Sequence, residues 1–472
     1  MDTRTRPKRW QLQASERVAI LIIGDLLMAA VALFLALYIW AAGDTWMEFN
    51  VEFIVEFPPF WFYFLPFFWV VLLVELYDVN RASSRRETLK GISLATLIYL
   101  LIYLLIYFTS DRYSLPRIGV SVFIGFSAFL TFLWRLAYIR MFTAPHLMRR
   151  VLIIGAGNAG KTLVDIIENL WPPPFFTVGL IDDDPSKLEK KVGQYTVIGD
   201  SSNLLAVIQK HQITDLVLAI SGEMKGEMFQ SLLTAQEMGV SLAPMPQVYE
   251  ELLGRVPIFL LETEWIVRSF VEKTSTSTFY ELAKSLIDFA GGLIGTIIMM
   301  GFFPIISIAI LLESGFPVFF TQERLGRGGQ PYQMVKFRTM ERDAERDGEA
   351  RLAEEKDQRV TKVGWFLRRT HLDELPQFIN VLRGEMSLVG PRAERPQLVE
   401  QFQKEIPFYR ARLLVKPGIT GWAQINYGYA GTVRETAVKL EYDLYYIEHR
   451  NLLLDISIIL RTVGTVLGFK GQ

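Results

Sequence analysis

The chain has 472 residues, of which 51% are hydrophobic and 13% aromatic, and its formal net charge is −1. This length allows two or three domains, and the apolar content favours a membrane protein over a soluble one. The absence of cysteine excludes disulfides, thiol catalysis and thiolate metal sites. The net charge argues neither for nor against nucleic acid, and we expect no nucleic-acid partner. The histidines are too scattered in sequence to indicate a histidine metal motif: His146, His211, His371 and His449.

Four apolar stretches open the chain, at residues 18–42, 57–74, 91–110 and 118–134. A membrane-spanning helix needs roughly 20 apolar residues, so we predict a unit of four transmembrane helices over residues 1–145. The first stretch is too long for a signal peptide, and no convincing cleavage signal follows it. It carries one charge, Asp25. No partner for Asp25 is visible, so a structural and a functional role both remain open.

Basic residues set the expected orientation of these helices. They precede the first stretch, separate the second from the third and follow the fourth (Arg135, Arg140, Arg149 and Arg150), whereas the other two loops are mostly acidic. The positive-inside rule then places both ends of the unit in the cytoplasm. We therefore expect a multi-pass protein of the bacterial inner membrane whose later domains are cytoplasmic.

A second domain is predicted over residues 146–272, where strands alternate with helices. Buried strands are expected at 151–154, 178–181 and 216–220, which is the pattern of a doubly wound, Rossmann-like α/β domain. Gly155, Gly157 and Gly160 form G-x-G-x-x-G between a strand and a helix, and Asp182 follows the second strand. These residues indicate either a nucleotide site or only tight packing of strand against helix. The acidic run 182–184 resembles the metal-binding D-x-D of glycosyltransferases, but a polar turn explains it equally simply.

A fifth apolar segment, 289–312, is long enough to cross a membrane but contains Pro304. Proline removes a helical hydrogen bond and favours a break. Both flanks of the segment are basic, so we predict a re-entrant helix over 286–313 that enters the membrane, bends at Pro304 and returns. The alternative is a simple span, which would place the C-terminal domain outside the cell.

The remaining chain is predicted to be a mixed α/β domain over residues 278–472. A hairpin is expected from 318–321 and 332–337 around a glycine-rich turn, and the charged stretch 341–359 is typical of a solvated helix. Asp373 is predicted to cap the helix that begins near Pro376, where the helix dipole would keep its carboxylate ionised. Glu374 would be free to hold a cation, and the arginines just before this pair are suited to phosphate.

Several motifs of this domain occur in a characteristic order. They are KFRTM (336–340), LDELPQ (372–377), NVLRGEMSLVGPR (380–392), KPGITGWAQIN (416–426) and LEYDLYYI (440–447). Together with a proline in an apolar hairpin, they resemble the bacterial sugar transferases, the monotopic phosphoglycosyl transferases. The resemblance implies transfer of a sugar 1-phosphate from a UDP-sugar to polyprenyl (undecaprenyl) phosphate with release of UMP. The earlier domains are similar to those of large family members that start exopolysaccharide, capsule or O-antigen assembly.

The resemblance also implies roles for individual residues. Asp373 is matched to the nucleophile that forms a phosphosugar intermediate in a ping-pong reaction, and Glu374 to the ligand of a Mg²⁺ cofactor. Substrate phosphates would be bound by Lys336, Arg338, Arg368 and Arg392. A homodimer is expected on family grounds alone.

Two residues depart from the family pattern. Ala393 replaces the second proline of the G-P-R-P motif, which puts the rigidity of the loop beside Arg392 in doubt. Phe303 replaces the serine that precedes the proline at the bend in many members, which removes a hydroxyl that could bond a freed carbonyl.

Two other functions remain as alternatives. One is a membrane-anchored nucleotide sensor, in which the glycine-rich loop would matter and Asp373 would not. The other is a glycosyltransferase that uses the run at Asp182 and releases UDP. The sugar and the pathway cannot be read from these residues.

Overall fold

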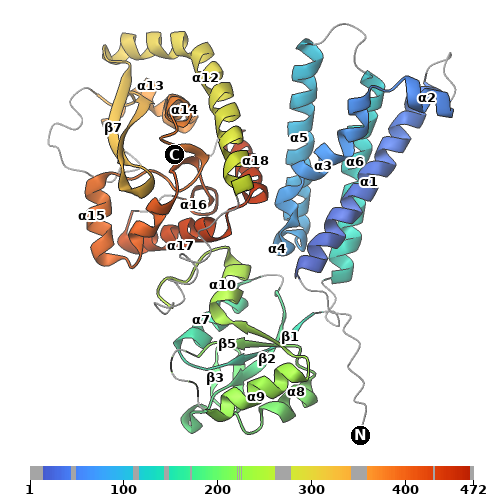
Figure 1. Cartoon of the computed structure of the whole chain (residues 1–472), viewed down its shortest axis with the longest axis vertical. Helices are drawn as coiled ribbons and strands as arrows, with labels where there is room; N and C mark the ends of the chain where they lie inside the picture. Colours follow the sequence, from blue (N-terminus) through green and yellow to red (C-terminus); the bar gives the residue numbers. More distant parts are fainter. Residues whose placement is uncertain are drawn as a thin grey trace. The chain divides into compact units, whose positions relative to one another are not determined.

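The computed structural model describes residues 14–43, 49–109, 116–142, 148–170, 173–220, 222, 224, 226–260, 278–341, 359–428 and 431–467. The chain divides into two compact units, Met1–Val248 and Tyr249–Gln472. Figure 1 shows that the first unit contains a group of helices and a sheet, and that the second contains a long bent helix above smaller α/β elements.

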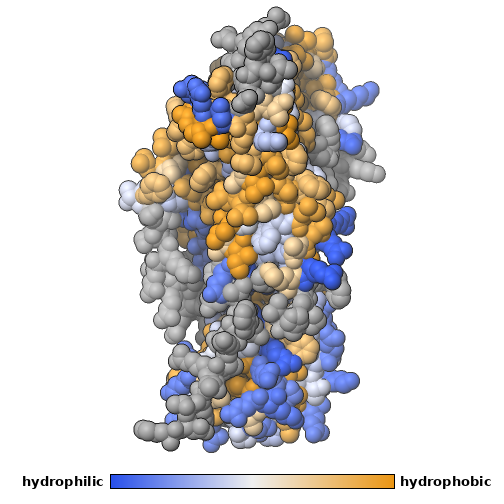
Figure 2. Space-filling model, turned by 90° about the vertical axis from the view of Figure 1, so that its right-hand side faces the viewer, coloured by the Kyte–Doolittle hydropathy of each residue, from blue (hydrophilic) through white to orange (hydrophobic). Residues whose placement is uncertain are grey.

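The N-terminal helices follow the predicted apolar segments. They are α1 (Ala14–Ala42), α2 (Val51–Glu56), η1 (Phe60–Phe64), α3 (Leu65–Leu72), η2 (Val74–Tyr77), α4 (Val79–Ala82), α5 (Arg85–Thr109) and α6 (Arg117–Phe142). Residues 16–42, 85–108 and 117–141 are long and apolar enough to cross a membrane, whereas the second predicted span forms a shorter apolar helix, 60–72. Figure 2 shows hydrophobic side chains gathered over one face of these helices. All four predicted segments are therefore helical, the second a shorter one.

Asp25 has a partner that the sequence does not reveal. Arg135, predicted to follow the fourth apolar stretch as a loop charge, lies inside α6 and is fully buried. Its Nη2 is 2.6 Å from Asp25 Oδ2, its Nε is 3.2 Å from Oδ1, and its Nη1 donates to the Leu76 carbonyl at 2.7 Å. A buried ion pair, in which each guanidinium nitrogen makes a hydrogen bond, holds α1 to α6. This geometry supports the structural reading of Asp25.

The second part of this unit is a six-stranded sheet. Its elements are β1 (Arg150–Ile154), α7 (Asn158–Asn169), β2 (Phe176–Ile181), η4 (Pro185–Lys187), β3 (Lys191–Val192), β4 (Tyr195–Gly199), α8 (Leu204–His211), β5 (Asp215–Leu218), α9 (Gly226–Glu237) and β6 (Ser241–Pro244). The strand order is β3-β4-β2-β1-β5-β6, and every pairing except β3 with β4 is parallel. Counting the parallel strands alone, the order is the 3-2-1-4-5 of a doubly wound sheet, as the alternating pattern predicts.

The long helix of the second unit, α12 (Thr278–Ser314), starts before the predicted 286 and contains Pro304. Figure 1 shows it as two arms that meet at a bend. A methyl group added at Gly291 or Gly295 would lie 2.4 Å from Leu388 or 2.3 Å from Phe378, so these glycines let α12 approach its neighbours closely. Asp288, buried in the same helix, accepts hydrogen bonds from the Ser387 hydroxyl and the Leu388 amide, both at 2.9 Å. The apolar helix is thereby anchored on residues 387 and 388.

The other elements of this unit follow α12 in the chain. They are β7 (Phe319–Leu325), η6 (Arg327–Gly329), β8 (Pro331–Phe337), α13 (Lys362–Arg369), η7 (Leu372–Glu374), α14 (Gln377–Leu382), β9 (Ser387–Val389), α15 (Pro396–Glu405), η8 (Tyr409–Leu414), β10 (Gly418–Thr420), α16 (Trp422–Asn426), α17 (Val433–His449) and α18 (Leu452–Leu467). Strands β7 and β8 form the predicted antiparallel hairpin. Most of the predicted charged helix, residues 342–358, lies outside the described residues.

The end of α10 (Met245–Leu253) and the chain after it pack with the second unit. Val256 and Ile258 are buried in its main core, and the Trp422 indole donates to the Gly254 carbonyl at 2.6 Å. The compact unit therefore begins at Tyr249, upstream of the domain boundary predicted at residues 272–278.

Candidate active site

Asp373 does not cap a helix, so that prediction is wrong. It lies inside the 3₁₀ turn η7, and α14 starts later, after Pro376, without a side-chain cap. The reason is the backbone of His371, whose φ of 56° is left-handed and redirects the chain after α13. On this short turn the Asp373 side chain is turned inward and is only 7% exposed.

Burial changes the expected ionisation of this carboxyl group. Desolvation, followed by the negative charge of Glu374, raises the pKa of Asp373 to about 6, against the opposing charges of Lys336, Arg368 and Arg392. The group is thus still largely ionised at neutral pH, as predicted, but the cations beside it and not a helix dipole keep it so. Its proton equilibrium lies close to the physiological range.

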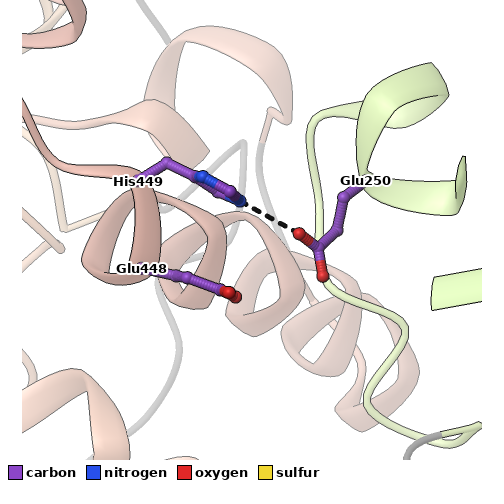
Figure 3. A group of neighbouring side chains, drawn as sticks. All are labelled: Glu250, Glu448 and His449. Atoms are coloured by element: carbon purple, nitrogen blue, oxygen red, sulfur yellow. Dashed lines mark hydrogen bonds and ion pairs between the residues drawn. The ribbon is translucent and has the colours of Figure 1, made fainter. Parts of the chain in front are cut away.

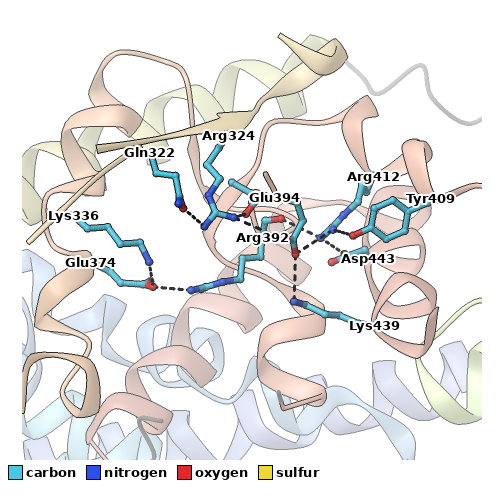
Figure 4. Close-up of polar contacts among 11 residues, drawn as sticks. Gln322, Arg324, Lys336, Glu374, Arg392, Glu394, Tyr409, Arg412, Lys439 and Asp443 are labelled. Atoms are coloured by element: carbon cyan, nitrogen blue, oxygen red, sulfur yellow. Dashed lines mark hydrogen bonds and ion pairs between the residues drawn. The ribbon is translucent and has the colours of Figure 1, made fainter. Parts of the chain in front are cut away.

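Glu374 joins two of the predicted phosphate-binding residues. Lys336 Nζ and Arg392 Nη2 lie 2.8 Å and 2.9 Å from the same atom, Glu374 Oε1 (Figure 4). Burial alone would raise the pKa of Glu374, but the charges of Arg392 and Lys336 and their hydrogen bonds lower it well below its ordinary value. The Arg392 side chain is 42% exposed, so its guanidinium reaches solvent while it bonds Glu374. The result is an anion held between two cations beside a second carboxylate.

Hydrogen bonds hold the loop around Arg392 where the family proline is missing. Arg324 Nη1 donates to the carbonyl of Ala393 at 3.1 Å, and Arg412 Nη2 donates to the carbonyl of Arg392 at 3.1 Å. The Leu325 amide also bonds the Glu394 carbonyl at 3.0 Å. These bonds restrict the backbone on both sides of residue 393, which answers the doubt about its rigidity.

A buried charge network stands behind this loop, and sequence reasoning missed it. Arg412 is bonded to Asp443 Oδ2 at 2.8 Å and to the Tyr409 hydroxyl at 2.7 Å, and lies 3.4 Å from Glu394 (Figure 4). The side chains of Arg412 and Asp443 are 4% and 2% exposed. Nothing in the local sequence separates this buried acid from a solvated one on a helix face, because Arg412 and Asp443 lie far apart in the chain.

The other two predicted phosphate ligands lie differently. Arg368 Nε donates to the Thr339 hydroxyl at 3.0 Å, and its charge acts on Asp373. Arg338 is buried and its Nη2 bonds the Ser314 carbonyl at 2.8 Å and the Gly315 carbonyl, so it binds the C-terminal end of α12. The structure therefore groups Lys336, Glu374 and Arg392 but directs Arg338 elsewhere.

The glycine-rich loop of the sheet domain has two tight positions and one open one. A methyl group added at Gly155, whose φ is 109°, would lie 2.6 Å from the carbonyl oxygen of Ala219. A methyl group added at Gly160 would lie 2.1 Å from the carbonyl oxygen of Gly155. At Gly157 it would meet nothing within 4 Å. Asp182 accepts from the Ala156 amide at 2.7 Å and pairs with Lys187 at 3.0 Å. Tight packing explains two of the glycines, and only Gly157 lies open to a ligand.

One group of side chains could hold a metal ion by its donor set. In the described part of the chain, Glu250, Glu448 and His449 bring ligand atoms within 4.8 Å of one another, and His449 Nε2 lies 2.9 Å from Glu250 Oε2 (Figure 3). Sequence reasoning missed the group because its members come from α10 and α17. It joins these two helices and includes none of the residues around Asp373.

A bent apolar helix packed on the elements that carry a buried and a partly buried carboxylate, with cations on the second, defines a membrane protein with a site suited to phosphate chemistry. The chain belongs to the bacterial sugar transferase family, which it matches over residues 279–469. Residues 73–246 match a second family described as a CoA-binding domain.

Relatives support this membership. The chain is 40% identical over 190 residues to a UDP-glucose:undecaprenyl-phosphate glucose-1-phosphate transferase of Caulobacter vibrioides, covering 40% of this chain and 70% of that protein. It is 40% identical over 227 residues to a UDP-N-acetylgalactosamine-undecaprenyl-phosphate N-acetylgalactosaminephosphotransferase of Aeromonas hydrophila, covering 48% of this chain and 52% of the relative. A Xanthomonas campestris pv. campestris UDP-glucose:undecaprenyl-phosphate glucose-1-phosphate transferase is 34% identical over 58% of this chain. The chain spans 52% and 57% of the last two relatives' own length.

Proposed function

We propose that this protein transfers a sugar 1-phosphate from a UDP-sugar to undecaprenyl phosphate and releases UMP. The observation that carries the proposal is the buried Asp373 beside the Lys336–Glu374–Arg392 ion pairs. The names of the relatives support the substrate classes, and they include both glucose and N-acetylgalactosamine. The particular sugar is therefore to be determined by a screen of UDP-sugars scored for UMP.

In the proposed first step, the Asp373 carboxylate attacks the β-phosphorus of the UDP-sugar. An acyl-phosphate bond forms, the bond to the bridging oxygen breaks, and UMP leaves with that oxygen. In the second step, a phosphate oxygen of undecaprenyl phosphate attacks the same phosphorus, and Asp373 leaves as a carboxylate. Lys336 and Arg392 are suited to bind the diphosphate, because both are cationic and Arg392 is partly exposed.

The residues present fit a Mg²⁺ ion. Mg²⁺ is usually bound by one or two carboxylates together with substrate phosphates, and Asp373 and Glu374 supply two carboxylates. Glu374 Oε1 already accepts two cationic donors, so it is a position where positive charge is stabilised. When bound, the ion would neutralise charge on the diphosphate.

The decisive experiment uses purified protein and UDP-sugar without lipid acceptor, labelled with ³²P at either phosphate. A β-label should remain on the protein and an α-label should leave as UMP. Asp373→Asn should abolish the adduct, whereas Glu405→Gln, which removes an exposed acid from α15, should retain it. An unlabelled protein, an active Asp373→Asn variant or release of UDP would each contradict the proposal, and UDP would favour the glycosyltransferase alternative.

We also propose that α12 is re-entrant and that the sheet domain and the C-terminal unit both lie on the cytoplasmic side of the membrane. The bend and the residues on both sides of it support this arrangement, since Met299 and Ile306 pack in one cluster with Phe337. The chain has no cysteine, so single cysteines can be introduced at Phe259, before α12, and at Gln330, after it. An impermeant maleimide applied to spheroplasts should label neither until the membrane is opened. Labelling of Gln330→Cys in intact spheroplasts would contradict the re-entrant path.

For the sheet domain we propose a nucleotide-containing ligand at the open glycine of its first strand-to-helix loop. The match to a CoA-binding domain and the open space at Gly157 support this. Thermal unfolding with coenzyme A, NAD or a UDP-sugar tests it: one of them should stabilise the protein, and Gly157→Val should remove the shift. An unfolding temperature that none of the three ligands raises above that of the ligand-free protein would contradict the proposal.

A further inference from the structure

A second basic cavity lies in the C-terminal unit and shares no residue with the Asp373 cluster. It has about 40 Å³ of room, whereas one water needs roughly 10–15 Å³. This room suits one small group and excludes a nucleotide or a sugar. The cavity is lined by residues of α12, β9 and α17, of the turn between β7 and β8, and of the loops before β10 and after α17: Glu281, Lys284, Ser285, Asp288, Arg327, Val389, Val415, Lys416, Tyr446 and Arg450.

The acids of this region are engaged by other groups. Asp288 accepts its two hydrogen bonds from Ser387 and Leu388. Glu281 lies 3.9 Å from Arg450, and Asp455, just behind the cavity, pairs with Lys284 at 3.1 Å. Glu281 and Asp455 are thus paired with two of the four cations, whereas Asp288 is held by neutral donors.

The other two cations, Arg327 and Lys416, have no ion-pair partner in the part of the chain that the structure describes. They come from different segments, η6 and the loop before β10, and both line the cavity. With four cations against the three acids Glu281, Asp288 and Asp455, the group keeps a net positive charge. A net positive charge beside a small polar cavity attracts an anion, and charge-assisted hydrogen bonds would hold it.

The cavity lies where α12 changes from polar to apolar. Lys284, Ser285 and Asp288 line it, whereas Leu286 and Phe289 of the same turns are 63% and 61% exposed. On a helix that enters a membrane, such a transition falls at the depth of the lipid headgroups.

We propose that this cavity is a binding site for a single phosphate group, separate from the catalytic site. The phosphate is contacted by Arg327 and Lys416. Its source is either the headgroup of an anionic phospholipid or free inorganic phosphate, which share this chemistry.

The test compares the full-length wild type with Arg327→Gln/Lys416→Gln and with Lys404→Gln/Arg434→Gln, which removes the same charge from exposed positions on α15 and α17. Binding of ³²P inorganic phosphate is measured by equilibrium dialysis in detergent. Retention of labelled dioleoyl phosphatidic acid, against dioleoyl phosphatidylcholine, is measured after reconstitution into nanodiscs. All variants are repeated with Arg392→Gln, so that phosphate bound near Glu374 is not counted.

We expect one phosphate or one phosphatidic acid to bind in the Arg392→Gln protein, and the Arg327/Lys416 variant to bind at least about tenfold more weakly, with no loss in the control. Loss of phosphatidic acid alone identifies a lipid source, and loss of phosphate alone a soluble one. Equal binding in all variants overturns the proposal. If the double variant does not fold, the single variant Arg327→Gln, at an exposed position, takes its place and should also bind more weakly than wild type. None of these results depends on formation of the Asp373 adduct.

Discussion

The raised pKa of Asp373 predicts a pH dependence that an ordinary carboxyl group would not show. With a pKa of about 6 in place of 3.8, the carboxylate is about 90% ionised at pH 7 and about 10% ionised at pH 5. If the ionised form is the nucleophile, kcat/KM for adduct formation falls about tenfold between these pH values, because that ratio reports the free enzyme. A carboxyl group at 3.8 would change by less than about a tenth over the same range.

The assay is the initial rate of ³²P-adduct formation from a β-labelled UDP-sugar without lipid acceptor, between pH 5 and 8. His371 is replaced as a control, because its imidazole belongs to the residue two places before Asp373. His371→Asn is suitable because asparagine tolerates the left-handed backbone at this position. The midpoint near 6 should persist in His371→Asn, and Glu374→Gln should move it to lower pH, because Glu374 raises the pKa of Asp373. A flat profile from pH 5 to 7, or loss of the acid limb in His371→Asn, refutes the reasoning.

Three further predictions concern stability. Arg412→Met leaves Asp443 buried without its counter-ion and should lower the free energy of unfolding by about 3–5 kcal/mol. The double variant Arg412→Met/Asp443→Leu should recover most of this loss, and denaturant unfolding in detergent measures both. Arg135→Met leaves the buried Asp25 carboxylate of α1 without its counter-ion and should destabilise the helix bundle by a comparable free energy, seen as a lower melting temperature. An unchanged melting temperature would contradict the structural role of this pair. Gly160→Ala places its methyl group 2.1 Å from a carbonyl oxygen and should destabilise the sheet domain by about 1–3 kcal/mol, whereas Gly157→Ala should stay within about 1 kcal/mol; equal costs would show that the loop packs differently.

Features that depend on nearby residues were predictable from the sequence. The apolar runs gave helices, the strands at 151–154 and 178–181 lie within β1 and β2, and the glycine-rich turn forms the hairpin between β7 and β8. The pairing of Glu374 with Lys336 and Arg392 also agrees with the motifs that suggested a shared site. Periodicity and turn chemistry act over a few residues, so a single sequence carries them.

Features that depend on distant residues were not predictable. Asp25 pairs with Arg135 of another helix, 110 residues later in the chain. Arg338, predicted to bind a substrate phosphate, instead donates to the C-terminal end of α12. The helix cap expected at Asp373 fails because His371 takes a left-handed backbone that no residue type at that position demands. In each case a tertiary contact or a backbone reversal outweighs the local preference.

The segment that precedes α12 has a practical consequence for dissecting the protein. A fragment starting at residue 278 would lack Val256 and Ile258, leaving an apolar hole between the helices that enclose them. It would also remove Arg255, whose charge opposes the burial that raises the pKa of Glu441 to about 7. A fragment that retains this interior must therefore begin at or before Tyr249, even though the match to the transferase family starts at residue 279.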